Sequence, residues 1–290
     1  MDCITSGKRC IENDQIIDSK KHKINDNIIN TNTHVIRYDN GNIYKGALSE
    51  NKKNGKGYFK YINGDSYSGY YKDDKRHGKG IFTCANGNMY DGEWKNGECN
   101  GKGIFKWKSG SIYTGDFKDS KICGNGILKN FNGSVYEGEF INNYMHGKGV
   151  MKYKDGSIYT GTFKNDKRNG IGIMQYYNGV IYNGEWENDQ TNGNGNMQTP
   201  DGSGYIGEWK NSMRHGKGTY KYLNGNSYVG EFKCNKKDGY GIYTYVNVGK
   251  TYIGEWKNGA KHGKGILFTK TKKIVGEWDD NNLIVISSDE

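Results

Sequence analysis

The segment YDGEWKNG at residues 90–97, followed by GKG at 101–103, decides the fold of this chain. Its Tyr90, Gly92 and Trp94 alternate with polar residues, so in a β-strand these three positions lie on one face. The two glycines of the GKG segment alternate in the same way, and six residues separate them from Trp94. The segment therefore predicts a two-stranded hairpin in which Trp94 pairs with the first of these glycines and Gly92 with the second.

The same pattern recurs through most of the chain at a fixed period. Tyr-x-Gly returns every 23 residues from Tyr44 to Tyr228, and Tyr252 follows after 24 residues. Each copy continues with a large, usually aromatic residue and a Gly-x-Gly, and a degenerate copy begins at Ile274. Self-similarity at a fixed period of this size is typical of repeat architectures. We therefore predict ten complete repeats and a partial eleventh.

Tight turns are expected between successive hairpins. Asn-Gly or Asp-Gly dipeptides stand at most of these joints, beginning at Asn40, Asn63, Asn86, Asn132, Asp155, Asn178, Asp201 and Asn224. They favour type I′ turns, in which both central residues have positive φ. The joint at Val248 lacks such a dipeptide, and the period slips at the same place. We therefore expect type I′ turns along one edge and six-residue loops along the other.

These signals predict an all-β protein, an elongated single-layer antiparallel β-meander of stacked two-stranded hairpins. The array spans residues 38–278. Residues 1–37 have no usable period and are expected to be a disordered or weakly structured tail. Residues 279–290 contain LIVIS, which predicts a short C-terminal strand that would blunt the open edge of the sheet. The 45 glycines against one proline exclude collagen and disfavour long helices.

The sequence also bears on the cellular location of the protein and on the state of its cysteines. No apolar run approaches the roughly 20 residues that span a bilayer, and the N-terminus lacks the apolar segment of a signal peptide. We expect a cytoplasmic protein, peripheral at most to a membrane or the cytoskeleton. The six cysteines have no paired spacing and are expected to be free thiols. Cys3 and Cys10 flank a basic pair and are candidates for S-acylation, although two unmodified thiols are the simpler interpretation.

The repeat resembles the MORN (membrane occupation and recognition nexus) repeat. Residues 90–103 and 252–265 match its YxGxWxxGxxxGxG pattern most closely, while other copies lack the middle glycine found at Gly97 and Gly259. The resemblance covers residues 38–278 and implies a non-catalytic scaffold. Proteins of this family serve membrane–cytoskeleton attachment, axonemal and basal structures, and parasite budding rings. Some arrays pair as antiparallel homodimers through their terminal repeats, so a homodimer is a further expectation.

No constellation of residues indicates catalysis. His77, His146 and His215 occupy the same repeat position three repeats apart, so neighbouring pairs stand about 30 Å from each other and cannot share a metal. No helical segment follows the Gly-x-Gly pairs, as a phosphate-binding loop would require. MORN arrays also precede lipid-kinase and methyltransferase domains, but only 12 residues follow the last repeat here. We predict a non-enzyme without a cofactor.

A ladder of acidic residues precedes the repeat aromatics on the opposite face of the strands. In the predicted register four of these residues would face a lysine of their own hairpin: Glu93 faces Lys102, Glu139 faces Lys148, Glu208 faces Lys217 and Glu255 faces Lys264. Such cross-strand ion pairs are worth a few tenths of a kcal/mol each. These lysines are therefore expected to have structural partners.

Most of the net charge of +10 falls on one predicted edge. The last three six-residue loops, at 210–215, 233–238 and 257–262, together carry +6. Their basic residues are Lys210, Arg214, Lys233, Lys236, Lys237, Lys257 and Lys261. A linear basic edge suits an anionic membrane surface, although charged loops also keep an array in solution. Nucleic acid is a less favoured partner, because the aromatics follow the packing pattern of the repeat instead of offering free faces.

Two functions remain open. The first is a protein-binding scaffold for an unidentified partner, with the aromatic face as a groove. The candidate residues are Tyr205, Trp209, Tyr220, Tyr222, Tyr228, Phe232 and Tyr243. The alternative is direct recognition of phosphoinositides or another anionic membrane lipid by the basic edge.

Overall fold

The computed structural model describes residues 21–24 and 33–286, and these residues contain strands and turns but no helix. They fall into two compact units, Met1–Lys154 and Asp155–Glu290. The strands of the first unit are β1 (Lys21–Ile24), β2 (His34–Tyr38), β3 (Ile43–Ser49), β4 (Lys52–Lys60), β5 (Ser66–Lys72), β6 (Lys75–Thr83), β7 (Met89–Lys95), β8 (Glu98–Lys106), β9 (Ile112–Lys118), β10 (Lys121–Lys129), β11 (Val135–Ile141) and β12 (Tyr144–Lys152).

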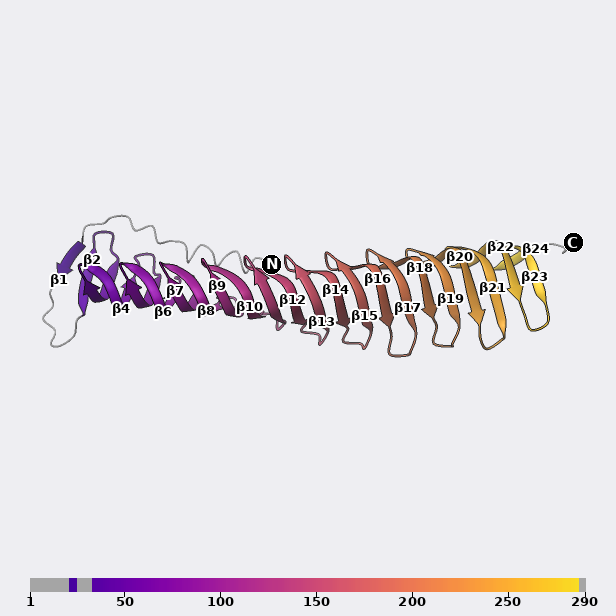
Figure 1. Ribbon diagram of the computed structural model, residues 1–290, viewed down its shortest axis with the longest axis horizontal. Helices are drawn as coiled ribbons and strands as arrows, with labels where there is room; N and C mark the ends of the chain where they lie inside the picture. The colour runs from indigo at the N-terminus through magenta and orange to yellow at the C-terminus, as the bar shows by residue number, and fades with distance from the viewer. Residues whose placement is uncertain (1–20, 25–32, 287–290) are drawn as a thin grey trace. The chain divides into compact units, whose positions relative to one another are not determined.

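The strands of the second unit are β13 (Ile158–Lys164), β14 (Lys167–Gln175), β15 (Ile181–Glu187), β16 (Gln190–Gln198), β17 (Gly204–Lys210), β18 (Met213–Lys221), β19 (Ser227–Lys233), β20 (Lys236–Tyr245), β21 (Lys250–Lys257), β22 (Ala260–Phe268), β23 (Lys273–Asp279) and β24 (Asn282–Ile286). Within each unit every strand pairs antiparallel with the next strand in sequence (Figure 1). The predicted all-β meander of stacked hairpins is confirmed within each unit.

The turn inside each hairpin is much tighter than predicted. Asn96 and Gly97 both have positive φ, 53° and 91°, and Lys95 pairs with Glu98 across them. This is the geometry of a two-residue type I′ turn. The predicted pairing of Trp94 with Gly101 is therefore wrong. Trp94 pairs instead with Cys99, and a bulge separates that pair from the pair of Gly92 with Gly103. The polar stretch is not a loop, because most of its residues extend the two strands.

The turns between hairpins also differ from the predicted type. The amide of Gly64 donates to the carbonyl of Tyr61 at 3.0 Å, and the amide of Tyr61 donates to the carbonyl of Asp65 at 2.9 Å. Gly64 has a φ of +93°, whereas Asn63 is not among the residues with positive φ. This is a type I turn followed by a left-handed glycine, as in three-residue hairpin loops. Asn63 contributes through its side chain, whose Oδ1 accepts the amide of Asp65 at 3.0 Å.

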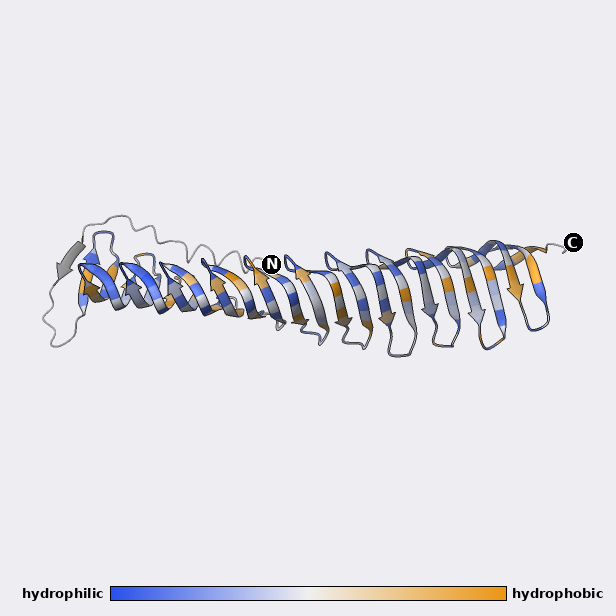
Figure 2. Ribbon diagram, in the orientation of Figure 1, coloured by the Kyte–Doolittle hydropathy of each residue, from blue (hydrophilic) through white to orange (hydrophobic). Residues whose placement is uncertain are grey.

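The core is a ladder of aromatic rings on one face of the strands, here called the tyrosine face. The ten tyrosines of the Tyr-x-Gly motif are at most 2% exposed. Trp94 packs edge-to-face on Tyr90 and on Tyr67 of the preceding repeat, with ring centroids 5.2 Å apart in both cases. Its Nε1 donates to the carbonyl of Gly80 at 2.9 Å. Each aromatic therefore joins two repeats, and stability arises from contacts between neighbours. Figure 2 shows strands that are mostly hydrophilic or neutral on the hydropathy scale, crossed by isolated hydrophobic positions.

Glycine is required where the tyrosine rings cross the strands. A Cβ added at Gly138 would lie 2.6 Å from the Cα of Gly149 and 2.6 Å from the hydroxyl of Tyr136. The ring that covers these positions without a side chain is that of the repeat tyrosine and not that of the aromatic residue that follows it. The glycines of both motifs are packing residues.

Strands β1 and β2 lie in the N-terminal segment, where a disordered or weakly structured tail was expected. Residues His34–Tyr38 form β2, which pairs with β3 and buries Ile36, so the expectation is wrong for this segment. Its alternating sequence HVIRY is compatible with a half-buried strand. Strand β24 pairs with β23. Cys3 and Cys10 lie outside the described residues, and the four described cysteines are free thiols, as predicted. The described part of the chain has no helix that could cross a membrane.

Candidate interaction surfaces

The seven basic residues predicted to form one edge occupy two different environments. Four of them are exposed beside the hairpin turns of the second unit: Lys210, Lys233, Lys236 and Lys257. The other three, Arg214, Lys237 and Lys261, are half-buried. The prediction of a solvent-facing edge is therefore wrong for these three residues, which we call the cation row. The four exposed residues are called the turn lysines.

Strand register explains why the cation row turns inward. Because the hairpin turn has only two residues, Lys237 lies in β20 opposite Phe232, and Lys261 lies in β22 opposite Trp256. Arg214 lies opposite Trp209 in the same way. Paired residues of neighbouring strands share a face of the sheet. A cation at this position therefore lies over the aromatic ladder of the tyrosine face.

Lys237 and Lys261 contact aromatic rings closely. The Nζ of Lys237 lies 3.7 Å from the ring centroid of Trp256 and 4.7 Å from that of Tyr243. The Nζ of Lys261 lies 5.4 Å from the centroid of Tyr245. These separations fall within the range of cation–π attraction. Burial, together with the charge of Lys261, lowers the pKa of Lys237 to about 8. Burial also lowers the pKa of Lys261.

Arg214 extends the same arrangement by one hairpin. Its guanidinium carbon lies 4.8 Å from the ring centroid of Tyr220. Its Nη2 donates to the backbone carbonyl of Asn235 at 3.0 Å, and its Nε to the Oδ1 of the same residue at 3.4 Å. Both acceptors are uncharged. The structure thus aligns three cations, one in each of three successive hairpins.

The predicted aromatic groove also divides into two parts. Four of its residues, Tyr205, Trp209, Tyr228 and Phe232, are at most 7% exposed and belong to the core, so they do not line a groove. Tyr220, Tyr222 and Tyr243 are half-buried, with centroids 4.6 Å apart from Tyr220 to Tyr222 and 5.5 Å apart from Tyr222 to Tyr243. Tyr245 continues this row 4.3 Å from Tyr243 and was missed, although its spacing of two residues places it on the same face. These four residues form the tyrosine cluster.

The equivalent position in other repeats shows that the fold does not require a cation there. It holds Cys99, Ile122 and Met145 in three repeats of the first unit and Thr191 in the second. Where Arg168 occupies it, the Nε lies 3.0 Å from the Oδ1 of Asp189. Among the described residues, no member of the cation row forms an ion pair. A cation also occupies this position at Lys53 and Arg76 in the first unit, where it is buried. The cation row is therefore distinguished by lying half-buried beside the tyrosine cluster and not by its charge alone.

The acidic ladder has a different role from the one predicted. The carboxylate of Glu139 accepts the backbone amide of Lys148 at 2.9 Å, and that of Glu208 accepts the amide of Lys217 at 2.9 Å. The bulge after the Tyr-x-Gly glycine displaces the strand, so the carboxylate reaches the backbone instead of the ammonium group. Within the part of the chain that the structure describes, the predicted ion pairs inside the hairpins are therefore not formed.

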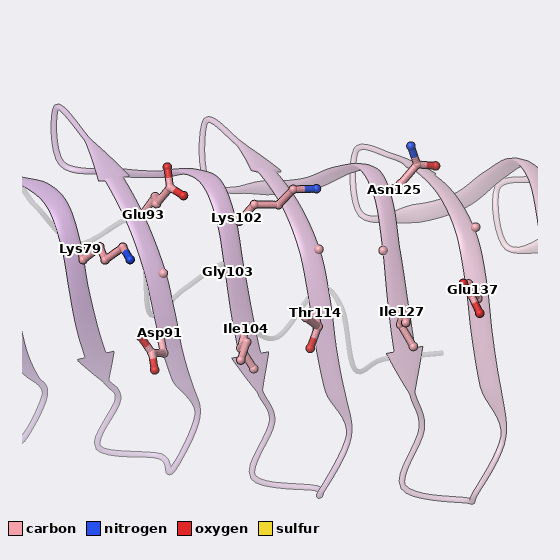
Figure 3. Close-up of a pocket in the computed structure, with 14 residues that line it drawn as sticks. Lys79, Asp91, Glu93, Lys102, Gly103, Ile104, Thr114, Asn125, Ile127 and Glu137 are labelled. Carbon is pink, nitrogen blue, oxygen red and sulfur yellow. The ribbon is translucent and has the colours of Figure 1, made fainter.

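A groove crosses the face opposite the tyrosines in the first unit (Figure 3). Its floor follows the glycine row, in which Gly92 pairs with Gly103 and Gly103 with Gly115. Its walls are lined by Lys79, Asp91, Glu93, Lys102, Ile104, Thr114, Asn125, Ile127 and Glu137. Lys102 is already paired with Asp116 at 2.5 Å. In the part of the chain that the structure describes, no group of three or more His, Cys, Asp or Glu could hold a metal ion.

Comparison with known proteins identifies the repeat. The MORN repeat model matches ten segments: 44–66, 67–89, 90–112, 113–135, 136–158, 159–181, 182–204, 205–227, 228–247 and 252–269. No curated protein matches the sequence. Among solved structures, the wild-type TCP10 domain of Danio rerio CPAP, in complex with a peptide of Danio rerio STIL, is 13% identical with a TM-score of 0.44, and the match covers 73% of this chain and 94% of that chain.

A second solved structure is the SAS-4 (dCPAP) TCP domain in complex with a Proline Rich Motif of Ana2 (dSTIL) of Drosophila melanogaster. It is 18% identical with a TM-score of 0.34, and the match covers 56% of this chain and 86% of that chain. The ten segments of the family model each begin at the tyrosine of a Tyr-x-Gly motif, and these tyrosines form the aromatic ladder described above. The chain belongs to the MORN repeat family.

Proposed function

We propose that this protein is a non-catalytic scaffold that binds a protein partner on the tyrosine face of its second unit. The observation that carries the proposal is the cation row lying over the half-buried tyrosine cluster. Tyrosine and arginine are enriched among residues that contribute most to binding at protein interfaces. MORN repeats are typically non-catalytic, which supports a binding role.

The internal repetition of the chain strengthens this proposal. Because four other repeats hold Cys, Ile, Met or Thr at the position of the cations, while three hold Lys53, Arg76 or Arg168, the fold is compatible with an uncharged residue there. A half-buried cation costs solvation energy unless something compensates for it. The aromatic rings supply part of this compensation, and acceptor groups of a partner that covers the tyrosine face would add to it. The family resemblance suggests membrane–cytoskeleton attachment in the cytoplasm as the setting.

The test is partner capture by the protein in its own cell. The double variant Tyr222→Ala/Tyr243→Ala removes two rings of the tyrosine cluster, and Tyr240→Ala serves as the control because its exposed ring lies on the opposite face of β20. Proximity labelling should lose a defined set of neighbours with the double variant and retain it with the control. Unchanged labelling by a folded double variant would overturn the proposal.

A second candidate function is attachment to anionic membranes through the turn lysines. All four are exposed, and Lys233 lies directly opposite Lys236 across the turn. A basic side chain near an anionic membrane contributes about 1 kcal/mol. Replacing the turn lysines with Gln should abolish binding to phosphoinositide liposomes, and wild-type binding should weaken steeply with salt. Replacing four exposed lysines of the first unit, Lys52, Lys72, Lys75 and Lys95, should have less effect. Equal binding by both variants would contradict this function.

A further inference from the structure

We infer that the cation row and the tyrosine cluster together form a site for an acidic segment in the polyproline II conformation, with a carboxylate at every third residue. The segment would run across strands β18 to β22 on the tyrosine face. This inference rests on the proposed function and names the chemical class of the partner. Three features of the second unit lead to it: unpaired charge, spacing and the aromatic surface between the charges.

The first feature is positive charge without a counterion. Within the described residues, the ammonium groups of Lys237 and Lys261 have no hydrogen-bond acceptor and no ion pair. Arg214 donates only to the uncharged oxygens of Asn235. By contrast, Arg168 occupies the same repeat position and is neutralised by Asp189. An ammonium group has three donors to satisfy, and carboxylate oxygens would satisfy those of the cation row with charge-assisted hydrogen bonds.

The second feature is the spacing of the cations. Successive members of the row lie one hairpin apart, which corresponds to two strand spacings or about 9.6 Å. A polyproline II helix has three residues per turn and rises about 9.3 Å per turn, so every third side chain points the same way. In a β-strand, residues three apart point to opposite faces. In an α-helix the nearest match is seven residues at about 10.5 Å. Polyproline II therefore fits the row best.

The third feature is the surface between the cations. Tyr220 and Tyr222 lie in or beside β18, and Tyr243 and Tyr245 lie in β20, so rings flank the row where the residues between the carboxylates would pack. Grooves lined with aromatic rings are the usual docking surface for polyproline II segments, because the preformed helix loses little entropy on binding. The tyrosine cluster thus favours a bound segment in the polyproline II conformation, and the cation row favours a segment with a carboxylate at every third residue.

The test compares two peptides of identical composition on the full-length protein. The probe contains Glu-Pro-Pro four times, and the matched peptide contains four consecutive glutamates followed by eight prolines. Fluorescence anisotropy should give a Kd at least tenfold lower for the probe. Equal affinity for the two peptides would mean that the protein recognises only their net charge, and it would overturn the inference. A (Lys-Pro-Pro) peptide of the same length should not bind.

The matched variants locate the site. Lys237→Gln/Lys261→Gln should weaken binding of the Glu-Pro-Pro probe at least tenfold, whereas Lys233→Gln/Lys236→Gln makes the same charge change at exposed positions and should change it less than threefold. Circular dichroism checks that both variants fold, and the comparison of peptides on the wild type stands without them. Equal effects of the two variants would overturn the inference.

Other outcomes separate this inference from the proposed function. If phosphoinositide vesicles bind through Lys237 and Lys261 while the probe does not, the site recognises a lipid headgroup and the inference fails. If the probe fails but Tyr222→Ala/Tyr243→Ala still abolishes partner capture, only the acidic polyproline class is wrong. If partner capture survives that double variant, the proposed function itself fails.

Discussion

Replacing Gly138 with Ala tests the aromatic packing that defines each repeat. The new Cβ would lie 2.6 Å from the Cα of Gly149, the carbonyl oxygen of Lys148 and the hydroxyl of Tyr136. Two of these three contacts are with backbone atoms that cannot rotate away. Overpacking of this kind costs about 1–3 kcal/mol. If Tyr136 moves to relieve the contact, it loses its 3.0 Å hydrogen bond to the carbonyl of Glu139, and this loss adds about 1 kcal/mol to the cost.

Conformational entropy offsets part of this cost. Ala restricts the unfolded chain more than Gly does, which contributes about 0.4–1 kcal/mol of stability. The expected net loss for Gly138→Ala is about 2 kcal/mol in the free energy of unfolding. Glu137→Ala is the matched control, because Glu137 is the preceding residue of β11, is exposed and lies on the opposite face. It should change stability by less than about 0.5 kcal/mol.

Guanidinium unfolding monitored by circular dichroism measures both variants. The midpoint should fall for Gly138→Ala with an unchanged m-value, since only then is the shift a change in stability. Tyr136→Phe combined with Gly138→Ala should cost less than the sum of the single changes, because removing the hydroxyl frees one of the three contacts. Equal midpoints for Gly138→Ala and Glu137→Ala, or strict additivity in the cycle, would refute the packing argument.

Two further predictions concern the turns and the cation row. Asn211 has a φ of 50° in the type I′ turn of its hairpin, so Asn211→Val should cost about 1–2 kcal/mol while Asn211→Gly should be nearly neutral, as thermal melts of the two variants would reveal. The pKa of Lys237 is about 8 in the folded protein and lies below its usual 10.5, so the unfolded chain binds more protons between these values. The free energy of unfolding of the wild type, compared with that of Lys237→Met, should therefore rise between pH 8 and pH 10.5. A comparison of the wild type with Lys261→Met should change in the same direction, because the pKa of Lys261 is also lowered. A melting-temperature difference that does not change with pH would contradict this assignment.

The repeat length, the strand order and the buried tyrosines could be predicted from sequence because they depend on local alternation and fixed spacing. Tyr90, Gly92 and Trp94 do lie on one face, as period two requires. The turn type could not be predicted in the same way. Asn-Gly is compatible both with a type I′ turn and with a type I turn followed by a left-handed glycine. Within the hairpins, Asn142 and Asn143 adopt positive φ without any glycine to signal it.

The error in the turn explains the error in the candidate site. A six-residue turn would place Lys237 in a loop with its side chain in solvent. Because the turn has only two residues, Lys237 lies in strand β20 and its side chain lies on the tyrosine face. Formal charge along the sequence did not distinguish it from the exposed Lys236 beside it. The relevant signal was available in the alignment of the repeats, where the position of Lys237 holds Cys99, Ile122 or Met145 elsewhere. A position that accepts buried apolar residues is not a loop position.

Site-specific photo-crosslinking tests the central claim most directly. A benzoylphenylalanine at Tyr222 places the reactive group in the tyrosine cluster, and one at Ile104 places it in the groove on the opposite face of the first unit. In the native cell, irradiation should yield a discrete protein adduct from position 222, and the adduct should disappear when Lys237 and Lys261 are changed to Gln. Adducts that form only from position 104, or that persist unchanged in the Gln variant, would contradict the account.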